Sequence, residues 1–315
     1  MSKVLYIFLL ATCGLGCGAA DKYELNLKAQ SPVSKTEYQK AIVGSLSGHQ
    51  PLSDGTRIVD RWTKEGRQYT RAYLKAVLEN EGIETKFQSY KFANLNAAID
   101  LLIDPFKGVN VYGVLPATSN SNDYIILGGH YDSGKRGAPG ADDNATGIAL
   151  IMSVLREVKK LKMRDKNLVV VFFDQEEEEL IGSRAFLEYI ENLSWNIQSI
   201  HCFDMVGWDG DGDKAMEVFS PSLDLINQYR EQAEKYDTPL KVIEIDKNTY
   251  SASSTDFDVF VPSAFEVIGA GECFYHRDSS PYKDSKEDTY DKVNFPYLLN
   301  CSNIVGDVIK ELITK

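Results

Sequence analysis

The sequence is short of positive charge, long apolar runs and internal repeats, and each absence excludes a class of protein. Its 315 residues include 34 Lys and Arg against 46 Asp and Glu, which gives a formal charge of −12. A nucleic-acid-binding protein needs a basic face, so this composition argues against a nucleic-acid partner. No internal apolar run reaches the about 18 residues that a transmembrane helix needs. No sustained period is visible, which excludes collagen-like, coiled-coil and repeat architectures.

Cysteine is also scarce. Two of the five cysteines fall within residues 1–20, and the others are Cys202, Cys273 and Cys301. Since no CxxC spacing occurs, neither a zinc knuckle nor a redox pair is expected. We expect Cys202, in an apolar strand, to be a buried free thiol. A Cys273–Cys301 disulfide remains an open alternative for an oxidising compartment.

Residues 1–20 resemble an export signal and are left out of the fold. Lys3 precedes an apolar stretch at 4–11, and small residues follow it. Cleavage at the end of this segment leaves residues 21–315, whereas Cys17 resembles the acceptor cysteine of a bacterial lipoprotein. We therefore expect a periplasmic, secreted or lipid-anchored protein of the bacterial envelope, with membrane contact only through such an anchor. The alternative is a buried N-terminal strand.

Apolar patterning predicts that strands and helices alternate through the central two thirds of the chain. The continuous apolar run 167–173 is typical of a strand buried on both faces of a parallel sheet. The predicted strands are 83–92, 109–115, 124–129, 167–173, 199–203, 241–245 and 264–268. The predicted helices are 36–48, 63–81, 146–161, 183–192, 221–236 and 295–313. We expect one α/β domain over residues 21–315, with a mostly parallel mixed sheet and helices on both faces.

Residues that commonly bind metals follow three of the predicted strands. His130 and Asp132 end the first strand, the acidic segment Asp174–Glu177 ends the second, and Asp204 ends the third. A further segment, Asp142-Asp143-Asn144, precedes the helix that follows the first strand. Each segment alone fits a helix cap or a solvated turn better than a metal site. Together they predict a site of nitrogen and oxygen ligands, because the carboxyl ends of parallel strands meet at one sheet edge.

Five segments in order carry a resemblance to a known family. They read HYDS, PGADDNATG, FFDQEEEELIGS, FDM and PYKDSKEDTYDKV, and they lie between Tyr124 and Val293. This set resembles the zinc aminopeptidases of the bacterial leucyl aminopeptidase and aminopeptidase Y type. That metallopeptidase family also contains glutaminyl cyclases, some carboxypeptidases and the transferrin-receptor ectodomain. The resemblance implies the zinc-exopeptidase fold and two divalent metal ions, with zinc the expected metal.

The resemblance assigns metal ligands residue by residue. His130, Asp143 and Asp204 match the residues that hold the first ion. Asp143 also matches the carboxylate that bridges the two ions, and Glu177 matches a further ligand of the second ion. The second ion then needs one more ligand from the C-terminal part of the chain.

That last ligand is where the sequence departs from the family. The family has a histidine in a stretch resembling PYYHTPEDTYDKV, and this chain has Asp284 at that position. Asp284 binds the ion itself, or His276 replaces it from eight residues upstream, or the second site is weak or empty. If Asp284 binds, the second ion has only oxygen ligands, which favours Mn²⁺ over Zn²⁺. The added negative charge would also make bound water less acidic, so we expect a higher pH optimum or an altered metal preference.

The activity that the resemblance implies is hydrolysis of peptides with a free N-terminus. Glu176 matches the general base, which takes a proton from water and passes it to the leaving amine. Asp132 matches the carboxylate that fixes the tautomer of His130. Two divalent ions would supply an acidified water and polarise the scissile carbonyl.

Two other functions stay open. Glutaminyl cyclases of the family usually carry an insertion where only four residues separate Glu177 from Gly182 here, and a tryptophan where Lys283 stands. Both differences favour an aminopeptidase over a cyclase. A non-enzymatic binding protein with a decayed second metal site is the other alternative, and the retained residues of the first site argue against it.

The sequence does not determine the side-chain specificity. The segment Ser253–Phe257 is similar to a loop near the substrate in the family, and it equally fits a helix cap. Three aromatic residues either line the substrate pocket or pack in the interior: Phe92, Trp208 and Tyr250.

Overall fold

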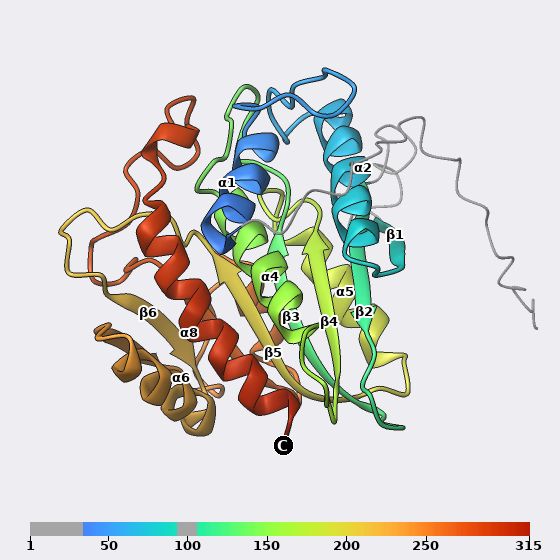
Figure 1. Ribbon diagram of the computed structural model, residues 1–315, viewed down its shortest axis with the longest axis vertical. Helices are drawn as coiled ribbons and strands as arrows, with labels where there is room; N and C mark the ends of the chain where they lie inside the picture. Colours follow the sequence, from blue (N-terminus) through green and yellow to red (C-terminus); the bar gives the residue numbers. More distant parts are fainter. Residues whose placement is uncertain (1–33, 93–105) are drawn as a thin grey trace, which may run out of the picture.

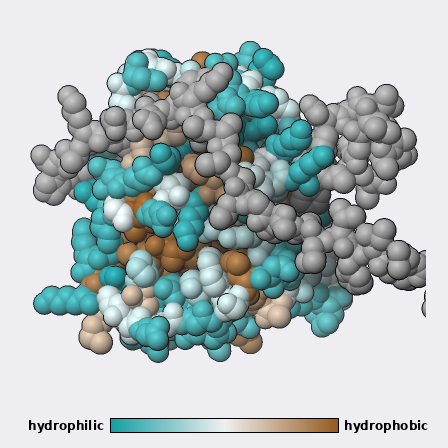
Figure 2. Space-filling model, turned by 90° about the vertical axis from the view of Figure 1, so that its right-hand side faces the viewer, coloured by the Kyte–Doolittle hydropathy of each residue, from teal (hydrophilic) through white to brown (hydrophobic). Residues whose placement is uncertain are grey.

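The computed structural model describes residues 34–92 and 106–315. The expected export signal at residues 1–20, with Cys17, lies outside the described residues, and so does the side chain of Phe92. Within the described part of the chain, no helix has both the length and the apolar character that a membrane span requires. On the face shown in Figure 2, hydrophilic residues surround smaller apolar areas.

An eight-stranded mixed sheet forms the centre of the described fold (Figure 1). Its strand order is β1-β2-β4-β3-β5-β8-β6-β7. The neighbours β4, β3, β5 and β8 run parallel, as do β6 and β7, while the pairs β1–β2, β2–β4 and β6–β8 are antiparallel. The strands are β1 Thr85–Phe92, β2 Phe106–Leu115, β3 Asp123–His130, β4 Asn167–Phe173, β5 Asn196–Asp204, β6 Met216–Ser220, β7 Leu240–Glu244 and β8 Glu266–Gly271. The predicted α/β class is confirmed.

Helices cover both faces of the sheet, as the sequence predicts. Helices α1, α2, α4, α6 and α8 pack on one face, and α5 and α7 pack on the other (Figure 1). Their bounds are α1 Lys35–Leu46, α2 Lys64–Asn80, α4 Ala145–Val158, α5 Ile181–Glu191, α6 Leu223–Lys235, α7 Asp256–Phe260 and α8 Phe295–Ile313, with a short 3₁₀ helix at Tyr290–Lys292. The last long helix coincides with its predicted range.

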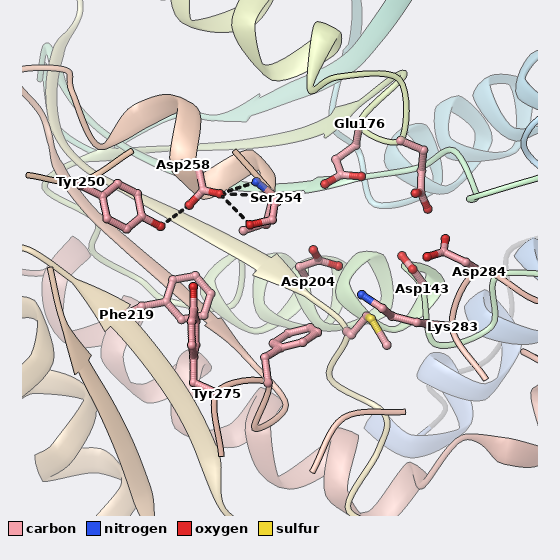
Figure 3. A pocket seen from close by; sticks show the side chains of 14 residues that line it. Asp143, Glu176, Asp204, Phe219, Tyr250, Ser254, Asp258, Tyr275, Lys283 and Asp284 are labelled. Atoms are coloured by element: carbon pink, nitrogen blue, oxygen red, sulfur yellow. Dashed lines mark hydrogen bonds between the residues drawn. The ribbon is translucent and has the colours of Figure 1, made fainter. Parts of the chain in front are cut away.

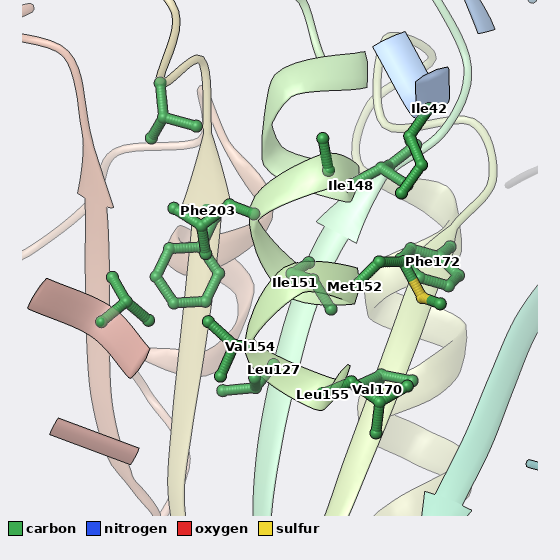
Figure 4. Close-up of a cluster of buried hydrophobic side chains, with 14 of the residues drawn as sticks. Ile42, Leu127, Ile148, Ile151, Met152, Val154, Leu155, Val170, Phe172 and Phe203 are labelled. Atoms are coloured by element: carbon green, nitrogen blue, oxygen red, sulfur yellow. The ribbon is translucent and has the colours of Figure 1, made fainter. Parts of the chain in front are cut away.

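The interface between α4 and the central strands is the core that fixes the sheet edge. Ile151 and Leu155 of α4 pack over Leu127 of β3, Val170 of β4 and Phe203 of β5, and none of them is more than 1% exposed (Figure 4). Full burial of each such side chain contributes about 1.5–3 kcal/mol to folding. Strand β4, with the sequence NLVVVFF, is buried along its whole length because helices cover both of its faces.

Two short elements are not predicted from the sequence. In strand β6, Glu217 interrupts the apolar pattern. Glu217 is fully buried and accepts hydrogen bonds from the Tyr275 amide and from His276 Nδ1. Helix α7 has five residues, too few to show a helical period. It begins after Thr255, so part of the segment Ser253–Phe257 is indeed a helix cap.

The three remaining cysteines are all buried free thiols. The expectation for Cys202 is confirmed, and the Cys273–Cys301 disulfide left open by the sequence is absent from the structure. Cys301 lies in the interior face of α8, among the core residues under that helix.

His201 of β5 is a buried neutral histidine. Its Nε2 lies 2.9 Å from Ser199 Oγ, and its Nδ1 lies 3.0 Å from Tyr229 Oη of α6. Burial lowers the pKa of His201 to about 3. In the unfolded chain His201 has the ordinary histidine pKa of about 6.5. At a pH between the folded and unfolded pKa values, the unfolded chain therefore binds a proton at His201 that the folded chain does not bind.

We predict that His201 makes the fold less stable as the pH falls below about 6.5. A His201→Gln variant keeps a polar side chain between Ser199 and Tyr229 but does not titrate. Between pH 7 and pH 5, wild type should lose about 2 kcal/mol more unfolding free energy than the variant. Urea unfolding of both proteins at pH 7, 6 and 5 measures this difference, and parallel losses in the two proteins would contradict it.

Candidate metal centre

The central parallel strands bring the predicted polar segments to one edge of the sheet. Strand β3 ends at His130, β4 ends just before Asp174, and β5 ends at Asp204. A cavity of about 400 Å³ opens at this edge (Figure 3). Five of the predicted site residues line it: Asp143, Glu176, Glu177, Asp204 and Asp284.

His130 is the centre of this cluster and is 1% exposed. Its Nε2 lies 3.2 Å from Asp143 Oδ1 and 3.4 Å from Asp204 Oδ1. The structure therefore brings together the three residues expected to hold the first ion. Two overlapping groups, each with its donor atoms within 4.8 Å of one another, are His130–Asp143–Glu177 and His130–Glu176–Asp204.

Asp132 connects His130 to the acidic turn after β4. Its Oδ1 lies 3.4 Å from His130 Nδ1, in the position expected for the carboxylate that orients the ring. The same oxygen accepts a hydrogen bond from the Glu176 amide at 3.1 Å, and Oδ2 accepts one from the Glu177 amide at 3.3 Å. The contact between Asp132 and His130 agrees with the sequence-based expectation, whereas the hydrogen bonds from Asp132 to both glutamate amides were not indicated by the sequence.

Asp284 enters the cluster beside Glu177. A Cβ atom placed on Gly134 would lie 1.8 Å from Asp284 Oδ1 and 3.1 Å from Glu177 Oε1. Both carboxylates therefore face the same small space over Gly134, which only a residue without a side chain leaves open. The departure from the family pattern at Asp284 places a carboxylate at the cluster (Figure 3).

The other histidines lie away from the cluster. His276 Nδ1 contacts the carboxylate of Glu217, and His276 is not among the residues that line the cavity. His49 stacks on Tyr290 with 4.1 Å between ring centroids, and His201 contacts Tyr229. Of the two residues predicted as the last ligand, the structure therefore places Asp284 at the cavity and His276 away from it.

Burial and crowding raise the pKa of the two glutamates in the cluster. Desolvation is the main cause for Glu177, and repulsion from Asp143 adds to it, so that its pKa rises to about 9. Desolvation likewise raises the pKa of Glu176 well above the usual range. For His130, burial acts to lower the pKa, but Glu176 and the neighbouring aspartates outweigh burial and raise it.

The donor set fits divalent cations. Glu177 Oε1 is buried and has no hydrogen-bond partner among the described residues. Bound dications would supply the opposite charge that lets several buried carboxylates stay ionised together. His130 with two aspartates is a typical zinc donor set. Asp143, Glu177 and Asp284 offer only oxygens, which suit harder ions.

Arg61 is a residue of the site that carries no signal in the sequence. It is 0% exposed, and its main-chain amide donates to Ser133 Oγ at 3.0 Å. Its guanidinium donates at 2.5–3.2 Å to five main-chain carbonyls, those of Leu46, Tyr131, Pro139, Gly140 and Asp143. Arg61 therefore fixes the strand end that carries His130 against the loop that carries Asp143.

Asp288 holds the same loop from the other side. Its carboxylate accepts hydrogen bonds from the Asp142 amide at 2.9 Å and the Asp143 amide at 3.1 Å. Desolvation raises the pKa of Asp288 to about 6. Asp288 falls within the last quoted motif, KEDTYDKV, so the motif pointed to it but gave it no role.

The far wall of the cavity is partly aromatic and partly polar (Figure 3). Tyr250 lines it and donates a hydrogen bond to Asp258, whose carboxylate also accepts from the Ser254 and Thr255 amides. Phe219, Phe274 and Tyr275 complete the aromatic part. Of the aromatic candidates named from the sequence, Tyr250 lines the cavity, whereas Trp208 donates to Asp278 and is not part of the lining.

Comparisons with known proteins agree with this architecture. The chain is 25% identical over 263 residues to a probable leucine aminopeptidase of Trichophyton verrucosum, an alignment covering 79% of this chain and 66% of that protein. The chain spans less than two thirds of the length of the curated relatives that it matches.

Solved structures share the fold. BSAP, a zinc aminopeptidase from Bacillus subtilis, superposes with a TM-score of 0.73 at 14% identity, covering 91% of this chain and 97% of that one. The glutaminyl cyclase of Bacteroides thetaiotaomicron superposes with a TM-score of 0.66 at 15% identity, covering 91% and 99%.

The sequence profile of Peptidase family M28 matches residues 110–309, which include every strand and loop that contributes a side chain to the cluster around His130. The predicted family resemblance is thereby confirmed, and the chain is a member of Peptidase family M28.

Proposed function

We propose that the protein is a metal-dependent aminopeptidase that releases N-terminal residues from peptides. The observation that carries this proposal is the convergence of His130 with five cavity-lining carboxylates at one sheet edge. The family membership and the relatives named as aminopeptidases support it. Zinc is the ion that the imidazole-containing half of the cluster favours.

The chain's own residues have distinct tasks in this reaction. Divalent ions bound by the cluster would supply an acidified water and charge stabilisation for the carbonyl oxygen. Glu176 lines the cavity beside the ligand set and takes a proton from water, then gives it to the leaving amine. Asp132 keeps the His130 ring in one orientation and, through two amides, fixes the turn that carries Glu176.

Asp284 completes a second ion site in this proposal, together with Asp143 and Glu177. The three carboxylates offer no nitrogen, so the site accepts Mn²⁺ more readily than the family's histidine-containing site does. The ligands Asp143, Glu177, Asp204 and Asp284 carry four negative charges, which balance two dications. These charges would weaken the acidifying effect of the ions on a bound water, so we expect a higher pH optimum.

Glutaminyl cyclization is the second candidate, since a cyclase shares the fold. The segment between Glu177 and α5 argues against it, because the helix begins at Ile181 with no inserted residues. A non-enzymatic binding protein is disfavoured by Glu176, whose carboxylate lines the cavity beside the ligand set. The segment 1–20 supports an exported or lipid-anchored protein that acts on external peptides.

Removal of metal should abolish activity. Release of amino acids by the chelator-treated protein should return with zinc or manganese, and only for peptides with a free N-terminus. Parallel assays on N-acetylated peptides and on N-terminal glutamine peptides provide the controls. Release from acetylated peptides, or cyclization of glutamine without hydrolysis of other peptides, would contradict the proposal.

Glu176→Gln should retain the bound metal while kcat falls by about 10²- to 10⁴-fold, because the general base is lost. Glu179→Gln is the matched control, since Glu179 is an exposed glutamate of the same turn. Metal content by elemental analysis and kcat are measured for both variants. If Glu176→Gln loses metal together with activity, Glu176 is a ligand and its role as base is wrong.

Asp284→His should shift the preference from manganese towards zinc, because it introduces a nitrogen ligand. Gly134→Ala should weaken the second ion without unfolding the chain, since the new methyl group displaces the flexible Asp284 carboxylate. The ratio of rates with zinc and manganese is compared among wild type, both variants and Asp291→His. Asp291 is an exposed residue of the short 3₁₀ helix that follows the loop of Asp284. An unchanged ratio in Asp284→His would exclude Asp284 as a ligand.

A further inference from the structure

One positive charge stands in a cavity otherwise lined by acids. Among the described residues that line the cavity, Lys283 is the one basic side chain. Six carboxylates share the cavity with it, those of Asp143, Glu176, Glu177, Asp204, Asp258 and Asp284. Lys283 is exposed, so its ammonium group can meet a molecule that enters the cavity.

The cavity's carboxylates already have other partners or tasks. Under the proposed function, four of them hold metal ions and Glu176 serves as the base. Asp258 accepts hydrogen bonds from the Ser254 amide at 2.6 Å, the Thr255 amide at 3.1 Å and the Tyr250 hydroxyl. The substrate's ammonium group cannot use Lys283, because both carry positive charge. Lys283 thus complements a group that the protein does not supply.

The surroundings of Lys283 suit an anion. Its Nζ lies 5.7 Å from the Phe274 ring centroid, and no ion pair joins it to a carboxylate within the described part of the chain. A cation–π contact at an exposed site is weak, about 0.5–1 kcal/mol, so an incoming carboxylate can replace it. In Figure 3, Lys283 reaches into the cavity on the opposite side from Glu176, with Asp143 and Asp204 between them.

We propose that Lys283 binds a carboxylate of the substrate and makes the enzyme selective for peptides that present one close to the scissile bond. This inference rests on the proposed function. Two parts of a peptide offer such a group: the side chain of an acidic N-terminal residue, and the free C-terminus of a dipeptide. The aromatic residues Phe219, Phe274 and Tyr275 line the same cavity and offer apolar contacts to the rest of such a peptide.

The test compares substrates that differ only in one charge. Asp-Ala-Ala-amide against Asn-Ala-Ala-amide tests the side chain, and Leu-Ala against Leu-Ala-amide tests the C-terminus. Wild type should favour the carboxylate member of at least one pair by about tenfold or more in kcat/KM, mainly through KM. Lys283→Met should remove that preference and Lys283→Arg should keep part of it. Lys286→Met, an exposed lysine of the same loop outside the cavity lining, should retain it fully.

Binding gives a readout that is independent of turnover. Calorimetry on the Glu176→Gln variant should show tighter binding of the carboxylate member of the pair. The Glu176→Gln/Lys283→Met double variant should bind both members equally. Equal losses on all four substrates in Lys283→Met would overturn the proposal, since Lys283 would then act on the reaction or the fold. A wild type without preference in either pair would overturn it as well. If no peptide is hydrolysed at all, the proposed function is wrong, and the binding data still decide the role of Lys283.

Discussion

The concentration of buried negative charge at the ends of three parallel strands is the constraint on which the rest of the site depends. His130, Glu176 and the aspartates around them lie within a few ångströms, and burial raises the pKa of Glu176 and Glu177. Bound cations would let these carboxylates stay ionised together. The strand ends supply the geometry for this, because β3, β4 and β5 run parallel and finish at one edge.

The backbone around the cluster is held by charged groups that bind no metal. Arg61 donates hydrogen bonds to five main-chain carbonyls, and Asp288 accepts hydrogen bonds from two amides of the loop that carries Asp143. Asp132 connects the histidine of one strand with the glutamates of the next. Each of these contacts restrains main-chain atoms, so the ligand positions are set before any ion binds. Such preorganisation lowers the ordering cost of binding.

The sequence predicts most of the architecture and most of the residues of the candidate site, for identifiable reasons. Continuous apolar runs such as 167–173 mark buried strands, and the motifs that follow them mark their carboxyl ends. Strand β6 is missed because Glu217 interrupts its apolar pattern, and α7 is missed because it is short. Arg61 cannot be found from the sequence, since its partners are carbonyls, which every residue has.

The position of Asp284 shows what sequence and structure each contribute. In the last motif, Asp284 stands where the family has a histidine. The sequence leaves three alternatives for the last ligand of the second ion: Asp284, His276, or a weak or empty site. The structure puts Asp284 over Gly134 next to Glu177 and engages His276 with Glu217. The ligands proposed for the second ion, Asp143, Glu177 and Asp284, therefore offer only oxygens. The charge of this set, and not only its shape, distinguishes the protein from the family pattern.

The number of metal ions that the folded chain binds is the decisive quantity for the proposed metal centre. Native mass spectrometry of the chelator-treated chain, loaded with excess zinc or manganese and then freed of unbound metal, gives the number of ions per folded chain. We expect two ions per folded chain. A count of one would contradict the role given to Asp284, and a folded chain that binds no ion would contradict the metal centre itself.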